Sequence, residues 1–268
     1  MRRPPRHEDA PGSALRRCGR GQGERLMKRS AMNMAGVVLA AIGGLGASSG
    51  SALAAVKGDV GVFSEYVFRG VAAEGGAAVQ GGIDYSHDSG FLGGIWASNT
   101  ALFGGSELDV YAGYLHHFSD TVALDVFALY YLLPEDQENP PFPPATKDLD
   151  TAEFGTTQFA GPVKAQFYYS PDFVATGKPS FYYSAAYSHA ITPTVSITAQ
   201  AGYTHGGGAE LAFGDRYIDY SLAITKTIRE GLVFSLTAVD TNLSGADLPS
   251  GRDDDPKVYV GLKYTFDF

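Results

Sequence analysis

Segments of about ten residues in which apolar and polar side chains alternate recur from residue 59 to the end of the chain. Residues 195–204 are typical, because every second residue is apolar or aromatic and its neighbours are mostly Ser, Thr, Gln or Gly. Successive side chains of a β-strand point to opposite faces, so each segment predicts a strand with one apolar face. We predict twelve strands, of which the sixth is the least well defined: 59–70, 77–87, 91–100, 106–118, 121–133, 148–159, 163–172, 179–191, 194–205, 216–228, 232–242 and 257–268.

The lengths of the links between these strands decide the fold class. Links after even strands are short, as at 88–90 and 119–120, whereas links after odd strands are longer, as at 134–147 and 243–256. Outer-membrane barrels have short periplasmic turns and long external loops. A soluble sandwich also has alternating strands but has no reason to alternate its link lengths. The sequence therefore predicts an all-β fold, a transmembrane antiparallel up-and-down β-barrel of about 12 strands formed by residues 55–268, with both termini on the periplasmic side.

The first 54 residues differ from the rest, since all 33 aromatic residues follow them. Basic residues at 27–29, an apolar run at 34–45 and the sequence Ala52-Leu53-Ala54 match the layout of a secretory signal peptide. The apolar run is too short to span a bilayer; a buried helix of a cytosolic domain is the alternative. We expect residues 27–54 to be a cleaved signal peptide and residues 1–26 to be a disordered or mis-assigned upstream extension. The expected location is the outer membrane of a Gram-negative bacterium.

Charge and cysteine content limit which binding partners and which covalent cross-links the protein can have. Residues 1–54 contain nine of the 20 basic and three of the 29 acidic residues, which leaves a net charge of −15 on residues 55–268. An acidic body argues against nucleic acid as a partner. The one cysteine, Cys18, lies in the upstream segment, so the barrel has no disulfide. No phosphate loop, zinc spacing or dinucleotide fingerprint occurs in the barrel region, and we predict no catalytic residue, metal or cofactor.

The last strand carries the most specific signal. Every second residue back from the terminus is apolar or aromatic, from Phe268 to Val260. A terminal Phe on such a strand resembles the signal that the barrel assembly machinery reads. We therefore predict Tyr264, Phe266 and Phe268 as an assembly signal on a lipid-facing strand with aromatic residues at the membrane interface. A soluble edge strand is the alternative, and it would leave an exposed apolar edge.

The same alternation predicts which charged residues line the interior. If Phe268 and Tyr264 face lipid, Lys263 and Asp267 face inward; an Arg or Lys facing lipid at mid-bilayer costs roughly 2–4 kcal/mol. The predicted pore-lining residues are Glu65, Arg69, Asp84, Glu107, Asp109, Asp125, Lys164, Asp219 and Lys263. With Asp267 they make seven acids and three bases, and acidic linings favour cations. In a barrel of intermediate size these charges could instead pair and fill the lumen.

Several segments together resemble the TorF family of putative porins. The resemblance rests on Ser64–Gly70, Val79–Tyr85, Gly90–Phe91 with Trp96–Asn99, Ser106–Tyr114, Tyr168–Phe173 and the C-terminal Tyr264–Phe268. It covers nearly all of residues 58–268. It implies an outer-membrane barrel with a pore, and it implies no catalytic residues.

The expected function is passive diffusion of small hydrophilic solutes through a porin-like, weakly cation-preferring channel that is not an enzyme. Expected partners are outer-membrane lipid and lipopolysaccharide, the barrel assembly machinery and small solutes; a homo-oligomer is left open. A closed structural or adhesive barrel is one alternative. An enzyme acting on lipids is another, because His205–Gly208 resembles an oxyanion-hole motif and His87 and Ser89 lie two residues apart. The acidic run Asp253–Asp255 and the Pro-rich loop 134–147 are expected to be solvated external loops.

Overall fold

A computed structural model describes residues 54–73, 76–99, 101–103, 105–134, 149–244, 252–253 and 255–268. The predicted extension 1–26, nearly all of the predicted signal peptide 27–54, most of the Pro-rich loop and Asp254 lie outside the described residues. Within the described part of the chain, no helix combines the length and hydrophobicity that crossing a membrane requires.

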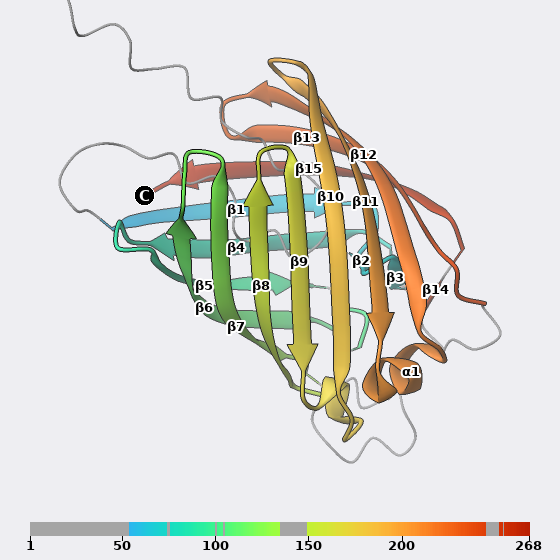
Figure 1. Ribbon diagram of the computed structural model, residues 1–268. Helices are drawn as coiled ribbons and strands as arrows, with labels where there is room; N and C mark the ends of the chain where they lie inside the picture. Colours follow the sequence, from blue (N-terminus) through green and yellow to red (C-terminus); the bar gives the residue numbers. More distant parts are fainter. Residues whose placement is uncertain are drawn as a thin grey trace, which may run out of the picture. The chain divides into compact units, whose positions relative to one another are not determined.

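In the part of the chain that the structure describes, twelve antiparallel strands close into a barrel, which confirms the predicted fold class (Figure 1). Each strand pairs with the next barrel strand along the chain, and the last pairs with the first. The barrel strands are β1 (Ala55–Phe63), β4 (Ala78–Ser86), β5 (Phe91–Ser98), β6 (Glu107–His117), β7 (Val122–Leu132), β8 (Thr151–Ala160), β9 (Val163–Ser170), β10 (Ser180–Thr192), β11 (Val195–His205), β12 (Tyr217–Arg229), β13 (Leu232–Thr241) and β15 (Lys257–Asp267).

The first predicted strand, 59–70, is wrong at both ends, whereas the other strands match their predictions to within three residues. The wall strand β1 ends at Phe63, and residues 64–73 leave the barrel wall. The physical reason is that residues 66–73 do not alternate: they are buried on both faces, so they need a protein environment on both sides. A barrel wall offers protein on one face only.

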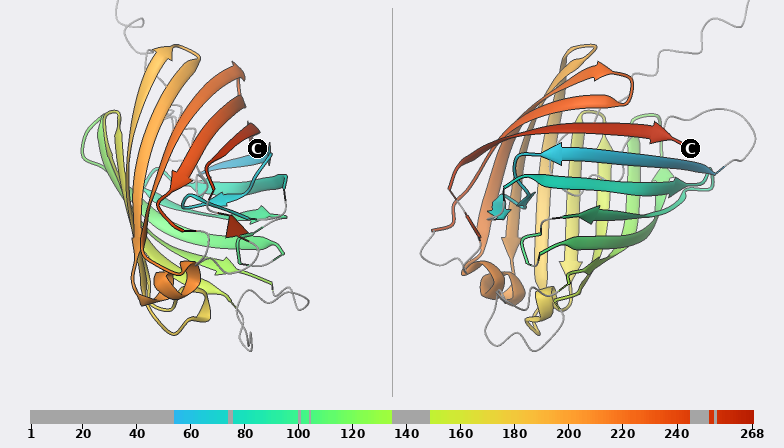
Figure 2. Two further views of the ribbon diagram at one scale, coloured as in Figure 1. Left: turned by 90° about the vertical axis from the view of Figure 1, so that its right-hand side faces the viewer. Right: turned by 180° about the vertical axis from the view of Figure 1, so that it is seen from behind.

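The long connections contain the remaining elements. These are β2 (Val67–Phe68), β3 (Val71–Ala73), the 3₁₀ turn η1 (Phe173–Ala175), helix α1 (Gly207–Phe213) and β14 (Arg252–Asp253). They gather at the end of the barrel away from the C-terminus, as Figures 1 and 2 show from three sides. The short turns lie at the opposite end. The predicted alternation of short and long links therefore corresponds to the two ends of the barrel.

The wall separates apolar from polar side chains. On β1, Val60 and Val62 are exposed on the outside of the barrel, whereas Asp59, which directly precedes Val60, is buried. The same arrangement recurs on β12, where Ile218 and Tyr220 are exposed and Asp219 is buried. An apolar outer belt with polar side chains inside is the pattern of a barrel in a bilayer.

Candidate functional site: a plugged, charged lumen

Strands β2 and β3 form a small hairpin, which we call the plug hairpin (residues 66–73). Val67 pairs with Ala72, and Phe68 pairs with Val71, while the outer edge of β3 pairs with β14. The two turn residues, Arg69 and Gly70, have φ values of 47° and 89°. Positive φ at both central residues is the tight hairpin turn that matches strand twist. For a residue with a side chain this conformation costs energy and persists only when the surroundings fix it.

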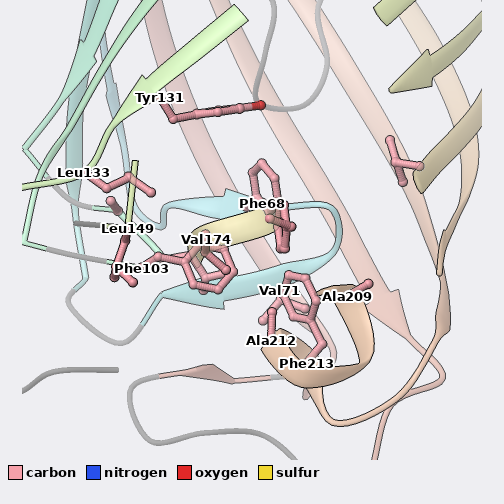
Figure 3. Close-up of a cluster of buried hydrophobic side chains, with 14 of the residues drawn as sticks. Phe68, Val71, Phe103, Tyr131, Leu133, Leu149, Val174, Ala209, Ala212 and Phe213 are labelled. Carbon is pink, nitrogen blue, oxygen red and sulfur yellow. The ribbon is translucent and has the colours of Figure 1, made fainter. Parts of the chain in front are cut away.

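The plug hairpin is packed on both faces against the inner wall. On one face, Val67 and Ala72 cluster with Val239 of β13 and Tyr259 of β15. On the other face, Phe68 and Val71 pack into a larger hydrophobic cluster, which we call the plug cluster and which Figure 3 shows in part. That cluster combines residues from the long connections with inward side chains of β7, β9, β10 and β12: Phe103, Val174, Ala209, Ala212, Phe213, Leu129, Tyr131, Tyr168, Tyr182 and Tyr217. The hairpin thus packs with inward side chains of β13 and β15 on one face and with those of β7, β9, β10 and β12 on the other.

Arg69, at the tip of the hairpin, is the best-defined polar feature of the interior. Its side chain is 6 % exposed, and its Nη2 donates to both carboxylate oxygens of Glu153, at 2.9 and 2.7 Å. Tyr131 donates its hydroxyl to the same carboxylate at 2.9 Å. The guanidinium carbon lies 4.5 Å from the ring centre of Tyr182 and 5.3 Å from that of Tyr168. We call these four wall residues, Glu153, Tyr131, Tyr168 and Tyr182, the Arg69 cage.

Electrostatics keep Arg69 charged. Burial is the largest single influence and disfavours the charge, but the attraction and hydrogen bonding of Glu153, together with Tyr131 and Tyr182, outweigh it and raise the pKa of Arg69 above its usual range. Arginine suits this position because its flat guanidinium can bind a carboxylate through two hydrogens and lie over aromatic faces. Hydrogen bonds between charged groups are about twice as strong as neutral ones. The pair therefore fixes the tip of the hairpin to the wall at β8.

A second polar contact holds the base of the hairpin. Tyr66 donates its hydroxyl to the carboxylate of Glu107 on β6. Burial, and then the nearby Glu107 charge, raise the pKa of the Tyr66 phenol well above its usual value. Asp109 lies two residues further along β6 on the same inward face and is also buried. The predicted lining residues Glu107, Asp109 and Arg69 therefore meet around the plug hairpin.

Inward-facing polar residues form a row across part of the barrel wall. Strand register aligns Asp125, Thr157, Gln166, Ser184, Gly202, Asp219 and Thr241 in adjacent strands from β7 to β13. Tyr182 donates to Asp219 at 3.3 Å. Both carboxylate oxygens of Asp125 are buried without a hydrogen-bond partner among the described residues. The predicted lining positions Asp125 and Asp219 thus face a polar interior.

The remaining predicted lining residues occupy separate places. Lys263 forms an ion pair with Asp59 of β1, with 3.1 Å between nitrogen and oxygen. Asp84 accepts a hydrogen bond from the Tyr111 hydroxyl. Lys164 is inward and half-buried on β9, and no ion pair to it occurs among the described residues. Glu65 is half-buried in the bend between β1 and the plug hairpin.

Sequence reasoning missed two interior acids, Asp59 and Glu153. Both are buried, and both follow the alternation rule: Asp59 is next to the outward Val60, and Glu153 is next to the outward Phe154. Glu153 was missed because the sixth predicted strand had the least regular pattern, although Glu153, Gly155 and Thr157 share one face. Asp267, predicted to face inward, is 81 % exposed and pairs with Lys57 at 3.6 Å at the end of the barrel.

Comparison with known proteins places the chain in a family. A family model described as "Bacterial protein of unknown function (Gcw_chp)" matches residues 46–266. The chain belongs to this family. No curated protein sequence matches this member of the Gcw_chp family.

Solved structures share the barrel of this Gcw_chp family member. The NanC porin superposes with a TM-score of 0.53 and 7 % identity, over 80 % of this chain and 100 % of that chain. The KdgM porin in complex with disordered oligogalacturonate gives 0.48 and 10 % identity, over 79 % and 99 %. OprD of Pseudomonas aeruginosa gives 0.41 and 11 % identity, over 80 % and 67 %. The likeness to NanC shows that this Gcw_chp barrel has the fold of a porin.

The predicted assembly residues lie on the outside of the Gcw_chp barrel. Tyr264, Phe266 and Phe268 are exposed, with neighbouring ring centres 6.0 and 5.4 Å apart. Their strand β15 pairs with β13 and with β1, so it closes the barrel. The backbone nitrogen of Phe268 donates to the carbonyl of Val56 at 3.2 Å. Their role in assembly stays a prediction.

The residues considered for an enzyme lie apart in the Gcw_chp barrel. Ser89 contacts Nδ1 of His87 through its hydroxyl at 2.6 Å, in the short turn after β4. Among the described residues no carboxylate contacts the other ring nitrogen of His87. His205, at the start of the glycine run, instead stacks on the rings of Phe181, Tyr183 and Tyr203. In the described part of the chain, no three His, Cys, Asp or Glu residues are grouped to hold a metal.

Proposed function

We propose that this protein is an outer-membrane channel for small hydrophilic solutes, and that the plug hairpin closes it in the state described. One observation carries the proposal: the inward face of the membrane-spanning wall bears charged and hydrogen-bonding side chains. A barrel that served only as a scaffold would have no need for buried acids such as Asp125, whose burial without a partner is costly.

The resemblance to TorF porins supports the same function, since it implies a pore formed by residues 58–268. The porin fold shared with NanC is consistent with it. Export through a cleaved signal peptide ending at Ala54, and residence in the outer membrane of a Gram-negative bacterium, complete the proposal. The expected partners remain lipid, lipopolysaccharide and the assembly machinery.

Charge on the inward face supports a weak preference for cations. The inward acids of the described strands are Asp59, Asp84, Glu107, Asp109, Asp125, Glu153 and Asp219. The bases that face them are Arg69, Lys164 and Lys263, with Lys57 and Lys257 at the strand ends. At about 0.15 M salt the Debye length is ~8 Å, so such charges act across a narrow lumen. Arg69 is neutralised by Glu153, which leaves the acids in excess.

A closed structural barrel is the second candidate, and the plug hairpin specifically favours it. Packing on both faces fills one end of the lumen with apolar side chains. Planar-bilayer recording of the refolded protein separates the two functions. A channel gives discrete conductance steps, at least in variants whose hairpin is loosened. If neither the wild-type protein nor such variants conduct while remaining folded, the barrel is structural.

A further inference from the structure

The Arg69 cage belongs to the wall and not to the plug hairpin. Glu153, Tyr131, Tyr168 and Tyr182 project from the neighbouring strands β8, β7, β9 and β10, respectively. Only Arg69 and Phe68, whose ring centre lies 4.7 Å from the guanidinium carbon, come from the hairpin. The wall therefore presents one carboxylate and several aromatic side chains that together surround a flat cation.

The chemistry of the cage is that of a guanidinium receptor. Glu153 accepts two hydrogen bonds from Nη2 of Arg69, and Tyr131 donates to its Oε2. Nη1 of Arg69 is buried without a hydrogen-bond partner among the described residues. The rings of Tyr168 and Tyr182 present electron-rich faces to the cation. Asp219, which accepts from the Tyr182 hydroxyl, adds a second buried acid nearby. An anion would be repelled by Glu153.

The hairpin that fills the cage is held as a separate piece. Its backbone hydrogen bonds run within the three-stranded sheet β14-β3-β2, which is distinct from the barrel sheet. At its base, the Ser64 nitrogen donates to the Val260 carbonyl, and the Ser64 hydroxyl accepts from the Val260 nitrogen. The tip is anchored by side chains alone, and Arg69 adopts a strained φ of 47° there. Displacing the tip breaks no strand pairing of the barrel wall.

We propose that the Arg69 cage is a binding site for guanidinium-bearing solutes, and that Arg69 occupies it as a built-in competitor. A solute that binds the cage displaces the hairpin tip and loosens the plug. This inference rests on the proposed function, because the solute must reach the cage through the channel. It names organic cations with a guanidinium group as the class of transported solute. Binding itself does not depend on conduction.

The test uses the full barrel and agmatine, a small amine with one guanidinium group. Trp96 is the only tryptophan of the chain, and it is half-buried against the plug cluster, so its emission reports on the plug. In the wild-type protein agmatine must compete with a tethered Arg69, whose effective concentration is on the order of millimolar. Arg69→Ala removes this competitor, and we expect it to bind agmatine about tenfold more tightly or better.

Matched variants assign the binding to the cage. In the Arg69→Ala background, Glu153→Gln removes the carboxylate of the cage, and we expect agmatine affinity to fall about tenfold or more. Asp84→Asn removes another interior acid, one that contacts Tyr111 and not the cage, and affinity should not change. Putrescine, which has amines but no guanidinium, should bind more weakly than agmatine because an ammonium has no flat face to lie over the rings of Tyr168 and Tyr182.

The outcomes separate this inference from the proposed function. Equal agmatine affinity in wild-type and Arg69→Ala proteins, or equal losses from Glu153→Gln and Asp84→Asn, would overturn the inference even if the barrel conducts. Selective binding in a barrel that never conducts would support the cage and refute the pore. If Arg69→Ala does not give the heat-modifiable band of a folded barrel, the comparison is made with Arg69→Lys. That variant keeps a cation but loses the flat guanidinium that lies over the Tyr168 and Tyr182 rings, and it should also bind agmatine more tightly than wild type.

Discussion

At the scale of single residues, the interior depends on how a few charges are satisfied. Arg69 and Glu153 are both almost completely buried, and each needs the other. Breaking a buried ion pair by removing one partner leaves an uncompensated charge, whereas removing an exposed pair costs little. The chain contains both kinds, because the Lys57–Asp267 pair lies at the exposed end of the barrel.

Glu153→Gln should therefore destabilise the plug strongly. We expect a loss of about 3–5 kcal/mol in the free energy of unfolding, because Arg69 would stay buried without a carboxylate. The matched control, Asp267→Asn, removes an exposed pair and should cost less than about 1 kcal/mol. Urea unfolding followed by Trp96 emission measures both. Equal losses in the two variants would show that the buried pair does not hold the plug.

The buried phenol of Tyr66 predicts that the stability of the folded protein falls at alkaline pH. Its pKa in the folded protein lies above the value of about 10 that a free tyrosine has. The stability gained by burying the neutral phenol is therefore complete below pH 10 and is lost as pH rises above it. Tyr66→Phe lacks this group, so its stability should fall less steeply above pH 10, by up to about 1.4 kcal/mol per pH unit. Unfolding curves between pH 8 and 11 that coincide for both proteins would contradict this.

At the scale of elements, β15 and the plug hairpin have opposite roles. β15 is paired on both sides and completes the wall. The hairpin is paired only within its small sheet and occupies the lumen. Changes in β15 should therefore affect whether a barrel forms, and changes in the hairpin should affect what a formed barrel does.

Deleting Phe268 should reduce insertion more than replacing Asp253, Asp254 and Asp255 with Asn. Phe268 directly follows the closing strand β15 and is exposed, and aromatic residues on the outer face anchor a barrel at the membrane interface. Arg252 and Asp253 pair with β3 through their backbones, which the Asn substitutions leave intact. The yield of the heat-modifiable folded band on a gel measures insertion. Equal yields from both variants would refute an assembly role for Phe268.

Replacing residues 66–73 with a Gly-Ser linker of equal length should raise conductance. The linker cannot make the apolar contacts that fix the hairpin to β13, β15 and the plug cluster. We expect frequent open events in planar bilayers where the wild-type protein is mostly closed. Leu211→Ala, at an exposed position of α1, is the control and should leave gating unchanged. An open wild-type channel that matches the linker variant would show that the hairpin is no barrier.

At the scale of the whole molecule, the surplus of interior acids governs ion preference. The linker variant should favour cations in a salt gradient, and Glu107→Gln with Asp109→Asn should move its reversal potential toward zero. Both acids face inward on one strand, so their fields add. Asp240→Asn, next to the outward Tyr220, is the control and should have no effect. Anion selectivity at low salt would contradict the prediction. The preference should fade at 1 M salt, where the Debye length is ~3 Å.

Alternation with a period of two determined the wall from sequence alone. Because a lipid-facing strand must be apolar on one face and polar on the other, the pattern itself states which residues face inward. Asp84, Glu107, Asp109, Asp125, Lys164, Asp219 and Lys263 all follow that rule. Link lengths likewise sorted the two ends of the barrel, since short turns and long connections lie at opposite ends.

Only the tertiary structure decided what fills the barrel. Residues 66–73 form a run that is apolar on both faces, and such a run satisfies a strand pattern as easily as a buried hairpin. Their place depends on contacts with Val239, Tyr259 and Phe213, which lie far away along the chain. The pairing of Arg69 with Glu153, 84 residues away, has the same origin. Local periodicity records which face a residue prefers, whereas a plug is defined by long-range packing that leaves no periodic trace.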